Sequence, residues 1–238
     1  MEEVTKRYAV VTGANKGIVF EICKQLASNG VKVNNAGIGR VSVDDPDTLA
    51  ASVKSHGGIG DGGLSLKWNE LITQTYKSSE KCLQTNYYGA KRMCEALIPL
   101  LQLSDSARIV NISSVMGTLK NITNKWAKGV LSDVDNDTEE NLDELLKEFL
   151  KDFKEGSLEA RGWPTCVSAY ILSKATMNAY SRNLAKKYPS FYINCVCPGK
   201  TDINFNNEGA ENTVRLALLP NGGPSSLSFL GKKSPAFN

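Results

Sequence analysis

The sequence predicts an α/β fold: one parallel sheet covered by helices on both faces, a doubly wound arrangement, in a single domain over residues 1–238. Three observations lead to this prediction. Short apolar runs alternate along the chain with longer segments of helical periodicity. The later apolar runs are nearly continuous, as in parallel strands that are buried on both faces. The 238 residues, 41% of them hydrophobic, are enough for the core of one such domain.

The N-terminal segment predicts a strand, a glycine loop and a helix, in that order. Residues 8–11 are a short apolar run, and residues 18–28 carry helical periodicity. The loop between them lies where backbone N–H groups and the helix dipole attract phosphate, although a tight turn without a ligand is the alternative. A second glycine cluster, residues 58–63, follows no strand, so we interpret it as part of a long loop over residues 40–66.

The rest of the chain predicts three helices and two buried strands. In the middle helix, Asn141-Leu-Asp-Glu144 resembles a capping box and Gly156 marks the end. The strands end at chemically useful pairs, Ser113-Ser114 and Pro198-Gly199. The expected helices are residues 68–101, 141–155 and 170–187, and the expected strands are residues 108–114 and 192–197.

Composition excludes several classes of function. The net charge of +3 comes from 28 basic and 25 acidic residues with no basic block, which argues against nucleic acid as a partner. No segment has the length of a membrane span or of a secretory leader, so we expect a cytoplasmic protein with reduced thiols. The six cysteines are scattered and His56 is the single histidine, so we expect no metal site.

Tyr170 and Lys174 lie four residues apart in a predicted helix, so their side chains are expected on one face. A nearby ammonium group stabilises phenolate, which lowers the pKa of a tyrosine and makes it a proton donor to a carbonyl group. Ser114 ends a buried strand, and ligands of open α/β sheets bind beyond the carboxyl ends of the strands. The order of these features, with Asn86 upstream and Pro198-Gly199 downstream, is rarely produced by chance.

The motifs TGANKGI, NNAG, QTNYYG, NISS, YILSK and CPG together resemble the short-chain dehydrogenase/reductase family over nearly the whole chain. The segment between NISS and YILSK, residues 118–168, is similar to an insertion in the carbonyl-reductase-like plant group of this family. The resemblance implies a Rossmann-type sheet, NADP(H) as cofactor and a small-molecule carbonyl or alcohol substrate. It also implies a monomer, because in that group the insertion covers the surface through which other members oligomerise.

The resemblance assigns the chemistry to four residues. Tyr170 would be the acid/base residue, and Lys174 would hold the nicotinamide ribose and lower the pKa of Tyr170. Ser114 would hydrogen-bond the carbonyl oxygen, with Ser113 as the second choice. Asn86 would position a water molecule that relays the proton.

The resemblance also assigns residues to the cofactor. Lys16 would be a partner for the 2′-phosphate of NADP, and Lys174 would contact the nicotinamide ribose. Asn35, Ala36 and Gly37 would pass beneath the adenosine ribose, while Gly199 and Thr201 would contact the nicotinamide. The residues expected to hold the phosphates are Gly13, Asn15, Lys16, Gly17 and Ile18.

The sequence departs from the family pattern mainly in its first 39 residues. Val19 stands where a third glycine is expected, and a branched side chain there should weaken cofactor binding. Only residues 31–33 separate the first helix from NNAG, although one βαβ unit takes about 30 residues. We therefore expect a truncated adenosine half that lacks one or two strands. Because parallel crossovers are right-handed, either residues 31–33 take the second-strand place and NNAG is displaced, or the glycine loop is reoriented.

A smaller departure lies after the last predicted strand. The run Pro198-Gly199-Lys200-Thr201-Asp202 is two residues shorter than the family spacing, which could loosen the contact with the nicotinamide.

Two main hypotheses about function follow. The first is an NADP-dependent oxidoreductase that interconverts a ketone or aldehyde and an alcohol by hydride transfer, with Tyr170 as acid/base. The alternative is a catalytically inactive truncated member of the family, or a splice or gene-model remnant, without dinucleotide binding. A partner-binding scaffold that uses the acidic helix after residue 141 is a third class, but a solvated amphipathic face explains that helix equally well.

Overall fold

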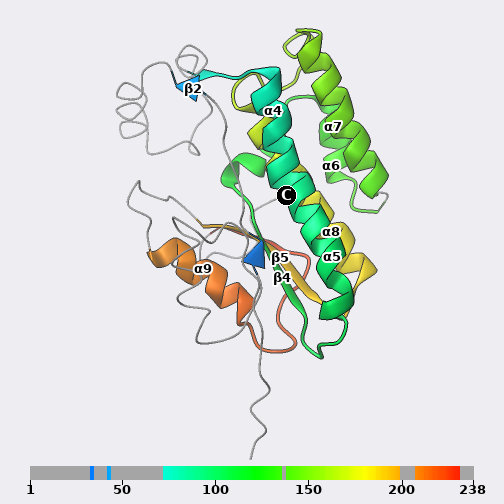
Figure 1. Cartoon of the computed structure of the whole chain (residues 1–238), viewed down its shortest axis with the longest axis vertical. Helices are drawn as coiled ribbons and strands as arrows, with labels where there is room; N and C mark the ends of the chain where they lie inside the picture. Colours follow the sequence, from blue (N-terminus) through cyan, green and yellow to red (C-terminus); the bar gives the residue numbers. More distant parts are fainter. Residues whose placement is uncertain (1–32, 35–41, 44–71, 136–137, 199–206, 231–238) are drawn as a thin grey trace, which may run out of the picture.

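A computed structural model describes residues 33–34, 42–43, 72–135, 138–198 and 207–230 (Figure 1). Its central sheet has the strand order β1, β4, β5, β6, and each neighbouring pair is parallel. Helices α4, α5 and α8 lie on one face of this sheet, and α9 lies on the other. The predicted doubly wound α/β fold is therefore confirmed. The strands are β1 (Val33–Asn34), β4 (Arg108–Ile112), β5 (Tyr192–Cys197) and β6 (Ser228–Leu230).

Alternate residues of the two central strands enter two different cores. Ile109 and Ile193 belong to the larger core on the side of α8 (Ser168–Lys187). Val110 and Val196 belong to a smaller core under α9 (Asn207–Ala217). Since side chains alternate across a strand, a sheet covered on both faces needs apolar residues at nearly every position. This requirement explains the continuous apolar runs in the sequence.

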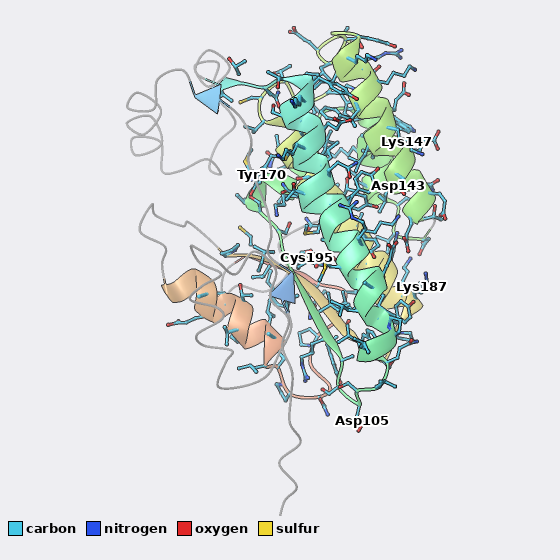
Figure 2. The ribbon with its side chains drawn as sticks, viewed as in Figure 1. Asp105, Asp143, Lys147, Tyr170, Lys187 and Cys195 are labelled. Carbon is cyan, nitrogen blue, oxygen red and sulfur yellow. The ribbon has the colours of Figure 1, made fainter. Side chains whose placement is uncertain are left out.

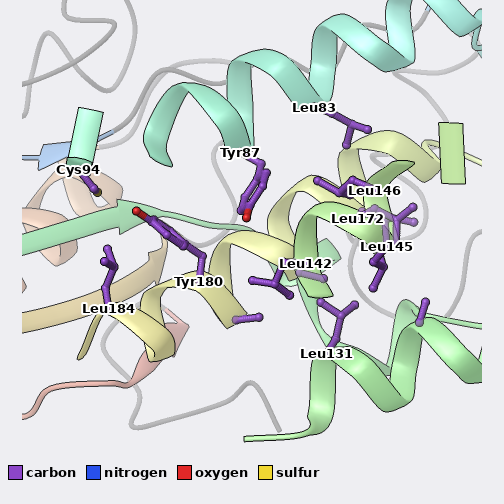
Figure 3. Packing of buried hydrophobic residues seen from close by; sticks show 14 of the residues in the cluster. Leu83, Tyr87, Cys94, Leu131, Leu142, Leu145, Leu146, Leu172, Tyr180 and Leu184 are labelled. Carbon is purple, nitrogen blue, oxygen red and sulfur yellow. The ribbon is translucent and has the colours of Figure 1, made fainter. Parts of the chain in front are cut away.

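The larger core lies between the sheet and a layer of helices. Helix α4 (Tyr76–Leu83) continues through a π-helical turn, η1 (Gln84–Tyr88), into α5 (Gly89–Leu101). Figure 3 shows Tyr87 from this turn and Tyr180 from α8 near one another in the core, and their ring centroids are 5.9 Å apart in an edge-to-face arrangement. Both side chains are fully buried, so the π-helical turn is fixed from inside the core.

The segment between the serine pair and α8 packs against the outside of the helical layer. It contains two short 3₁₀ turns, η2 (Val115–Gly117) and η3 (Leu119–Asn121), followed by α6 (Lys125–Ser132) and α7 (Glu139–Lys154). Helix α7 contacts both α4 and α8 through an apolar stripe. Lys91 of α5 forms salt bridges with Glu139 and Asp143 of α7 at 3.1 and 3.0 Å. The buried residues of the stripe are Leu142, Leu145, Leu146 and Phe149.

Several predicted boundaries differ from the structure. Strand β4 ends at Ile112 instead of residue 114, and α8 begins at Ser168 instead of residue 170. The helix expected over residues 68–101 begins only at Tyr76, because Thr75 caps it: its hydroxyl accepts a hydrogen bond from the Ser78 N–H at 3.2 Å. Before the cap, β3 (Ile72–Thr73) pairs antiparallel with β2 (Ser42–Val43), inside the expected loop of residues 40–66. Likewise α7 is capped by Thr138 and not by Asn141, whose own N–H is donated to the Thr138 hydroxyl.

Strand β1 shows which strand of the sheet lies beside the strand that leads into NNAG. Val33 pairs with Val110 and Asn34 with Asn111, so β1 lies directly beside β4 and parallel to it. This pairing favours the alternative in which the NNAG strand is not displaced. The glycine loop on which the other alternative depends lies outside the described residues, as do the predicted first strand and first helix.

Helix α9 and strand β6 were not predicted as elements from the sequence. In the parts of the chain that the structure covers, no helix combines the length and the apolar character needed to cross a bilayer.

Candidate active site

The candidate site lies at the carboxyl ends of β4 and β5, where the first turns of α8 approach the sheet. Ser113 and Ser114 follow β4 directly, and the N–H of Ser113 donates to the carbonyl oxygen of Val196 on β5 at 2.8 Å. Figure 2 shows Tyr170 on the side of the helical layer away from Asp143 and Lys147 of α7. The parallel sheet thus brings a serine pair that follows one strand close to a tyrosine and a lysine 56 to 61 residues later in the chain.

Of the two serines, Ser114 is the one that faces Tyr170. Its Oγ accepts a hydrogen bond from the Met116 N–H at 3.2 Å, which leaves its own proton available for donation. A hydrogen bond between Ser114 and Tyr170 lowers the pKa of the phenol. Ser113 is only 3% exposed, and its hydroxyl has no partner among the described residues. The geometry therefore favours Ser114, the first choice from the sequence.

Tyr170 and Lys174 lie on one side of α8, as their spacing predicts. The Lys174 Nζ is 5.7 Å from the centroid of the Tyr170 ring. The same ammonium group donates to the backbone carbonyl of Ile112, the last residue of β4, at 2.8 Å. Lys174 is only 4% exposed, so it ties α8 to the end of β4 from within the protein.

One electrostatic expectation is not met. We expected Lys174 to lower the pKa of Tyr170, but burial raises the pKa of the phenol above its ordinary value, and the hydrogen bond with Ser114 offsets only part of that rise. Burial also lowers the pKa of Lys174 to about 8, which weakens its charge as a source of stabilisation for phenolate. In this arrangement Tyr170 is a protonated phenol at neutral pH.

Asn86 lies in the π-helical turn η1 and is fully buried. Its Nδ2 donates to the Ser173 Oγ at 3.0 Å and to the Cys82 Sγ at 3.3 Å. Ser173 in turn donates to the carbonyl oxygen of Tyr170 at 2.8 Å. A π-helical turn is frequent at functional sites, and here it aims an amide at the turn of α8 that carries Tyr170 and Lys174.

Sequence reasoning missed two residues that build this site. Ser173, which links Asn86 to α8, was visible as the residue before the lysine in YILSK, but a serine inside a helix carries no signal of its own. Gly117 lies against the backbone of α8: a Cβ placed on it would come within 2.7 Å of the Lys174 carbonyl carbon and 2.9 Å of the Ala175 nitrogen. Only glycine allows this approach, which seats the turn after Ser114 on the helix.

The turn that carries Ser114 is also tied to β5. The N–H of Val115 donates to the Cys197 Sγ at 3.2 Å. Cys195 lies one pleat earlier on the same strand, and its Sγ is 3.0 Å from the Ser181 Oγ of α8. Both cysteines are buried and neither forms a disulfide among the described residues, in agreement with their interpretation as strand packing residues.

The proposed phosphate and nucleotide contacts lie outside the described residues. They are Gly13, Asn15, Lys16, Gly17, Ile18, Asn35, Ala36, Gly37, Gly199 and Thr201. Within the described residues, no group of three or more histidine, cysteine, aspartate or glutamate side chains is arranged to hold a metal ion.

Comparison with known proteins shows full-length relatives, although no family model matches the chain. It is 46% identical to a (+)-neomenthol dehydrogenase of Arabidopsis thaliana, covering 98% of both chains. It is 43% identical to short-chain dehydrogenase/reductase 1 of Saponaria officinalis, covering 94% of both. Mouse carbonyl reductase [NADPH] 1 is 30% identical over 89% of the chain and 91% of the mouse protein.

A solved structure agrees with these relatives. Salutaridine reductase from Papaver somniferum superposes with a TM-score of 0.82 at 38% identity, covering 94% of this chain and 99% of the other. The alignment to the Arabidopsis protein spans 291 positions, more than the 238 residues present, so that protein has positions with no counterpart here. The chain belongs to the short-chain dehydrogenase/reductase family.

Proposed function

We propose that the chain is an NADP-dependent oxidoreductase that interconverts a ketone or aldehyde and an alcohol by hydride transfer. The observation that carries the proposal is the meeting of Ser114, Tyr170 and Lys174 at the carboxyl edge of the parallel sheet. The named relatives are dehydrogenases and reductases, which supports the reaction class.

Ser114 and Tyr170 would both act on the substrate oxygen, Ser114 as a hydrogen-bond donor and Tyr170 as the acid/base residue. The Ser114 Oγ already accepts from the Met116 N–H, so its hydroxyl can donate to a carbonyl oxygen and hold it in place. Tyr170 holds a proton at neutral pH, since the ordinary pKa of a phenol is about 10 and burial raises it further. In reduction, the phenol gives this proton to the oxygen as the carbonyl carbon becomes an alcohol carbon. In oxidation, the tyrosinate takes the proton back.

Lys174 and Asn86 would support Tyr170. An ammonium group whose pKa is about 8 remains mainly charged at neutral pH, and it would hold the hydroxyls of the nicotinamide ribose. Asn86, fixed by Ser173, would hold the water that returns a proton to Tyr170. Neither residue would touch the substrate in this scheme, so their loss should slow turnover less than loss of Tyr170.

The cofactor proposed for this site is NADP(H), which supplies the hydride. The polar groups at the edge of the sheet, a phenol, an ammonium and a serine hydroxyl, suit the ribose and carboxamide end of a nicotinamide nucleotide. NADPH appears in the name of the mouse relative, which supports the choice between the two nicotinamide cofactors. Lys16 would meet the 2′-phosphate, with the phosphates held by the surrounding glycine loop and the ribose and nicotinamide by residues 35–37, Gly199 and Thr201.

A second candidate is a truncated member that no longer binds the dinucleotide. The observation in its favour is the difference between 291 aligned positions and 238 residues. A loss between the first helix and NNAG would remove part of the adenosine half while leaving Ser114, Tyr170 and Lys174 in place. The chain could therefore keep its catalytic residues and still have lost the ability to bind the dinucleotide.

We also propose a single domain over residues 1–238 that acts as a monomer in the cytoplasm. Support for a monomer comes from α7, which packs on α4 and α8 and covers the outer face of both helices. Residues 118–168 form this inserted segment, and residues 1–39 would be the truncated dinucleotide-binding half.

Nucleotide binding is the first experiment. The purified chain is heated with increasing NADPH or NADP, and with ATP as a control, while its unfolding is followed. A specific binder gains roughly 2.7 kcal/mol of stability at a hundredfold excess of ligand over Kd. We expect NADPH and NADP to raise the melting temperature and ATP to leave it unchanged.

The absence of any shift at millimolar NADPH would favour the truncated, inactive alternative. In that case a chain with a complete second and third strand restored is assayed for carbonyl-dependent oxidation of NADPH. Activity of the restored chain would show that only cofactor binding was lost. Continued inactivity would count against the roles given to Ser114, Tyr170 and Lys174.

A further inference from the structure

The residue immediately before α8 has an unusual backbone conformation. Val167 has φ 46° and ψ 31°, in the left-handed region, and provides no side-chain cap for the helix. A branched side chain strongly disfavours this conformation, so neighbouring contacts must hold it. The Val167 carbonyl accepts the hydrogen bond from the Ile171 N–H at 3.0 Å, the bond that begins α8. The conformation of Val167 therefore sets where Tyr170 lies.

A single side-chain amide holds both ends of this turn. The Gln74 Nε2 donates to the carbonyl oxygen of Thr165 at 2.9 Å. The Gln74 Oε1 accepts from the Ser168 Oγ at 3.1 Å. These two partners bracket Val167 on either side. Gln74 is separated from them by 91 and 94 residues in the sequence, so the turn is fixed by a tertiary contact and not by its own residues.

Gln74 is itself held at a defined place. It lies between β3, which pairs with β2, and Thr75, whose hydroxyl caps α4. On the far side of the turn, the Trp163 Nε1 donates to the buried Asp152 of α7 at 2.7 Å. The path from Trp163 to Ser168 is thus anchored to α7 at its start and to Gln74 at its end.

We propose that Gln74 is a positioning residue for Tyr170: its amide keeps the left-handed turn at Val167 closed and so holds the phenol at its hydrogen bond with Ser114. This role rests on the proposed function, because it acts through the proposed acid/base residue. Gln74 touches neither Tyr170 nor Ser114 in the hydrogen bonds described above. Its effect should therefore appear in turnover and in the order of the first turn of α8, and not in cofactor affinity.

The test compares Gln74→Ala with Gln102→Ala, which removes the same amide from an exposed position at the end of α5. Because small displacements of a reacting group can cost up to 10²-fold in rate, we expect Gln74→Ala to lower kcat about tenfold. The KM for NADPH should stay within about twofold of the original value. Gln102→Ala should leave both constants unchanged. A role in overall stability alone would change neither constant of the folded protein.

A rescue variant separates positioning from a general loss of stability. Glycine adopts the left-handed region readily, so Val167→Gly should make the turn less dependent on the amide. In the double variant Gln74→Ala/Val167→Gly, we expect the tenfold loss in kcat to shrink to about threefold or less. An undiminished loss in the double variant, or a loss shared by Gln102→Ala, would overturn the proposal.

Amide hydrogen exchange tests the same contact without any turnover. In Gln74→Ala, exchange of the N–H groups in the first hydrogen-bonded turn of α8, from Ile171 onward, should become at least about tenfold faster, while α7 is unchanged. Unchanged exchange in α8 would overturn the proposal whether or not the chain reduces a carbonyl. If the original chain shows no turnover but exchange responds as expected, the proposed function fails while Gln74 keeps its role in holding the turn.

Discussion

Helices α7 and α8 begin in opposite ways. At the start of α7, the Thr138 hydroxyl accepts a hydrogen bond from the Asn141 N–H at 3.2 Å. Glu139 and Glu140 occupy the first turn, where negative charges interact favourably with the helix dipole. At the start of α8, Val167 is left-handed, no side chain caps the helix and no acidic residue occupies the first turn. The start of α7 has the capping side chain and the charges that stabilise a helix N-terminus, whereas the start of α8 has neither.

The difference follows from what each helix does. Helix α7 buries an apolar stripe and exposes a charged face, so local signals and amphipathic packing are enough to form it. Helix α8 is buried on nearly all sides and must present Tyr170 and Lys174 to the end of β4. Its start is determined by Gln74, Gly117 and the strands, which are distant in sequence. Proteins commonly break local rules at functional sites and compensate through tertiary contacts.

The largest effect should come from Tyr170→Phe. Loss of a positioned general acid slows reactions by about 10²- to 10⁴-fold, so we expect turnover to become nearly undetectable. The thermal shift with NADPH should persist, because the ring remains in place. Tyr76→Phe, on the exposed side of α4, is the matched control and should retain full activity. Full activity of Tyr170→Phe would refute its role as the proton donor.

An intermediate effect is expected from Gly117→Ala, which tests whether α8 depends on close contact. The added methyl group would meet the Lys174 backbone at 2.7 Å, so the turn after Ser114 and the helix must move apart. We expect a loss of about 1–3 kcal/mol in the free energy of unfolding, together with a lower kcat.

Gly129→Ala is the matched control for this change. In α6 a Cβ at position 129 would have no neighbour within 4 Å, so the substitution should stabilise the protein by about 0.5–1 kcal/mol. Both free energies come from denaturant unfolding. Equal changes in the free energy of unfolding for the two glycine substitutions would contradict the close contact between α8 and the turn after Ser114.

The smallest effect should come from Thr138→Ala at the start of α7. Removing a threonine cap costs about 1 kcal/mol, and thermal unfolding should detect this loss. Turnover should be unchanged, because α7 meets the site indirectly, through α4, α8 and the path from Trp163 to Ser168. Thr138→Ser keeps the capping oxygen and should recover most of the stability. A drop in kcat without a drop in stability would show that α7 and the site are more closely coupled than the comparison suggests.

The fold was more predictable than the site. Strands were expected over residues 108–114 and 192–197 from their apolar runs, and both are present, although the first ends at Ile112. The ends of α5 and α8 at Leu101 and Lys187 were expected from helical periodicity. The start of α4 was missed because Ile72 fits a helical stripe as well as it fits a strand. Only pairing with Val43 distinguishes the two, and that partner is remote in sequence.

For the site, the sequence by itself determined the residue types and their order: a serine pair after a buried strand, then a tyrosine and a lysine four residues apart on one helix. These follow from local spacing and from the rule that parallel strands end at one edge of a sheet. Tertiary structure alone decided that Ser114 faces Tyr170, that burial raises the pKa of the phenol, and that Gln74 and Gly117 seat α8. The physical reason is that burial of Tyr170, the close approach at Gly117 and the left-handed turn at Val167 all depend on contacts with residues dozens of positions away. The local sequence does not predict such contacts.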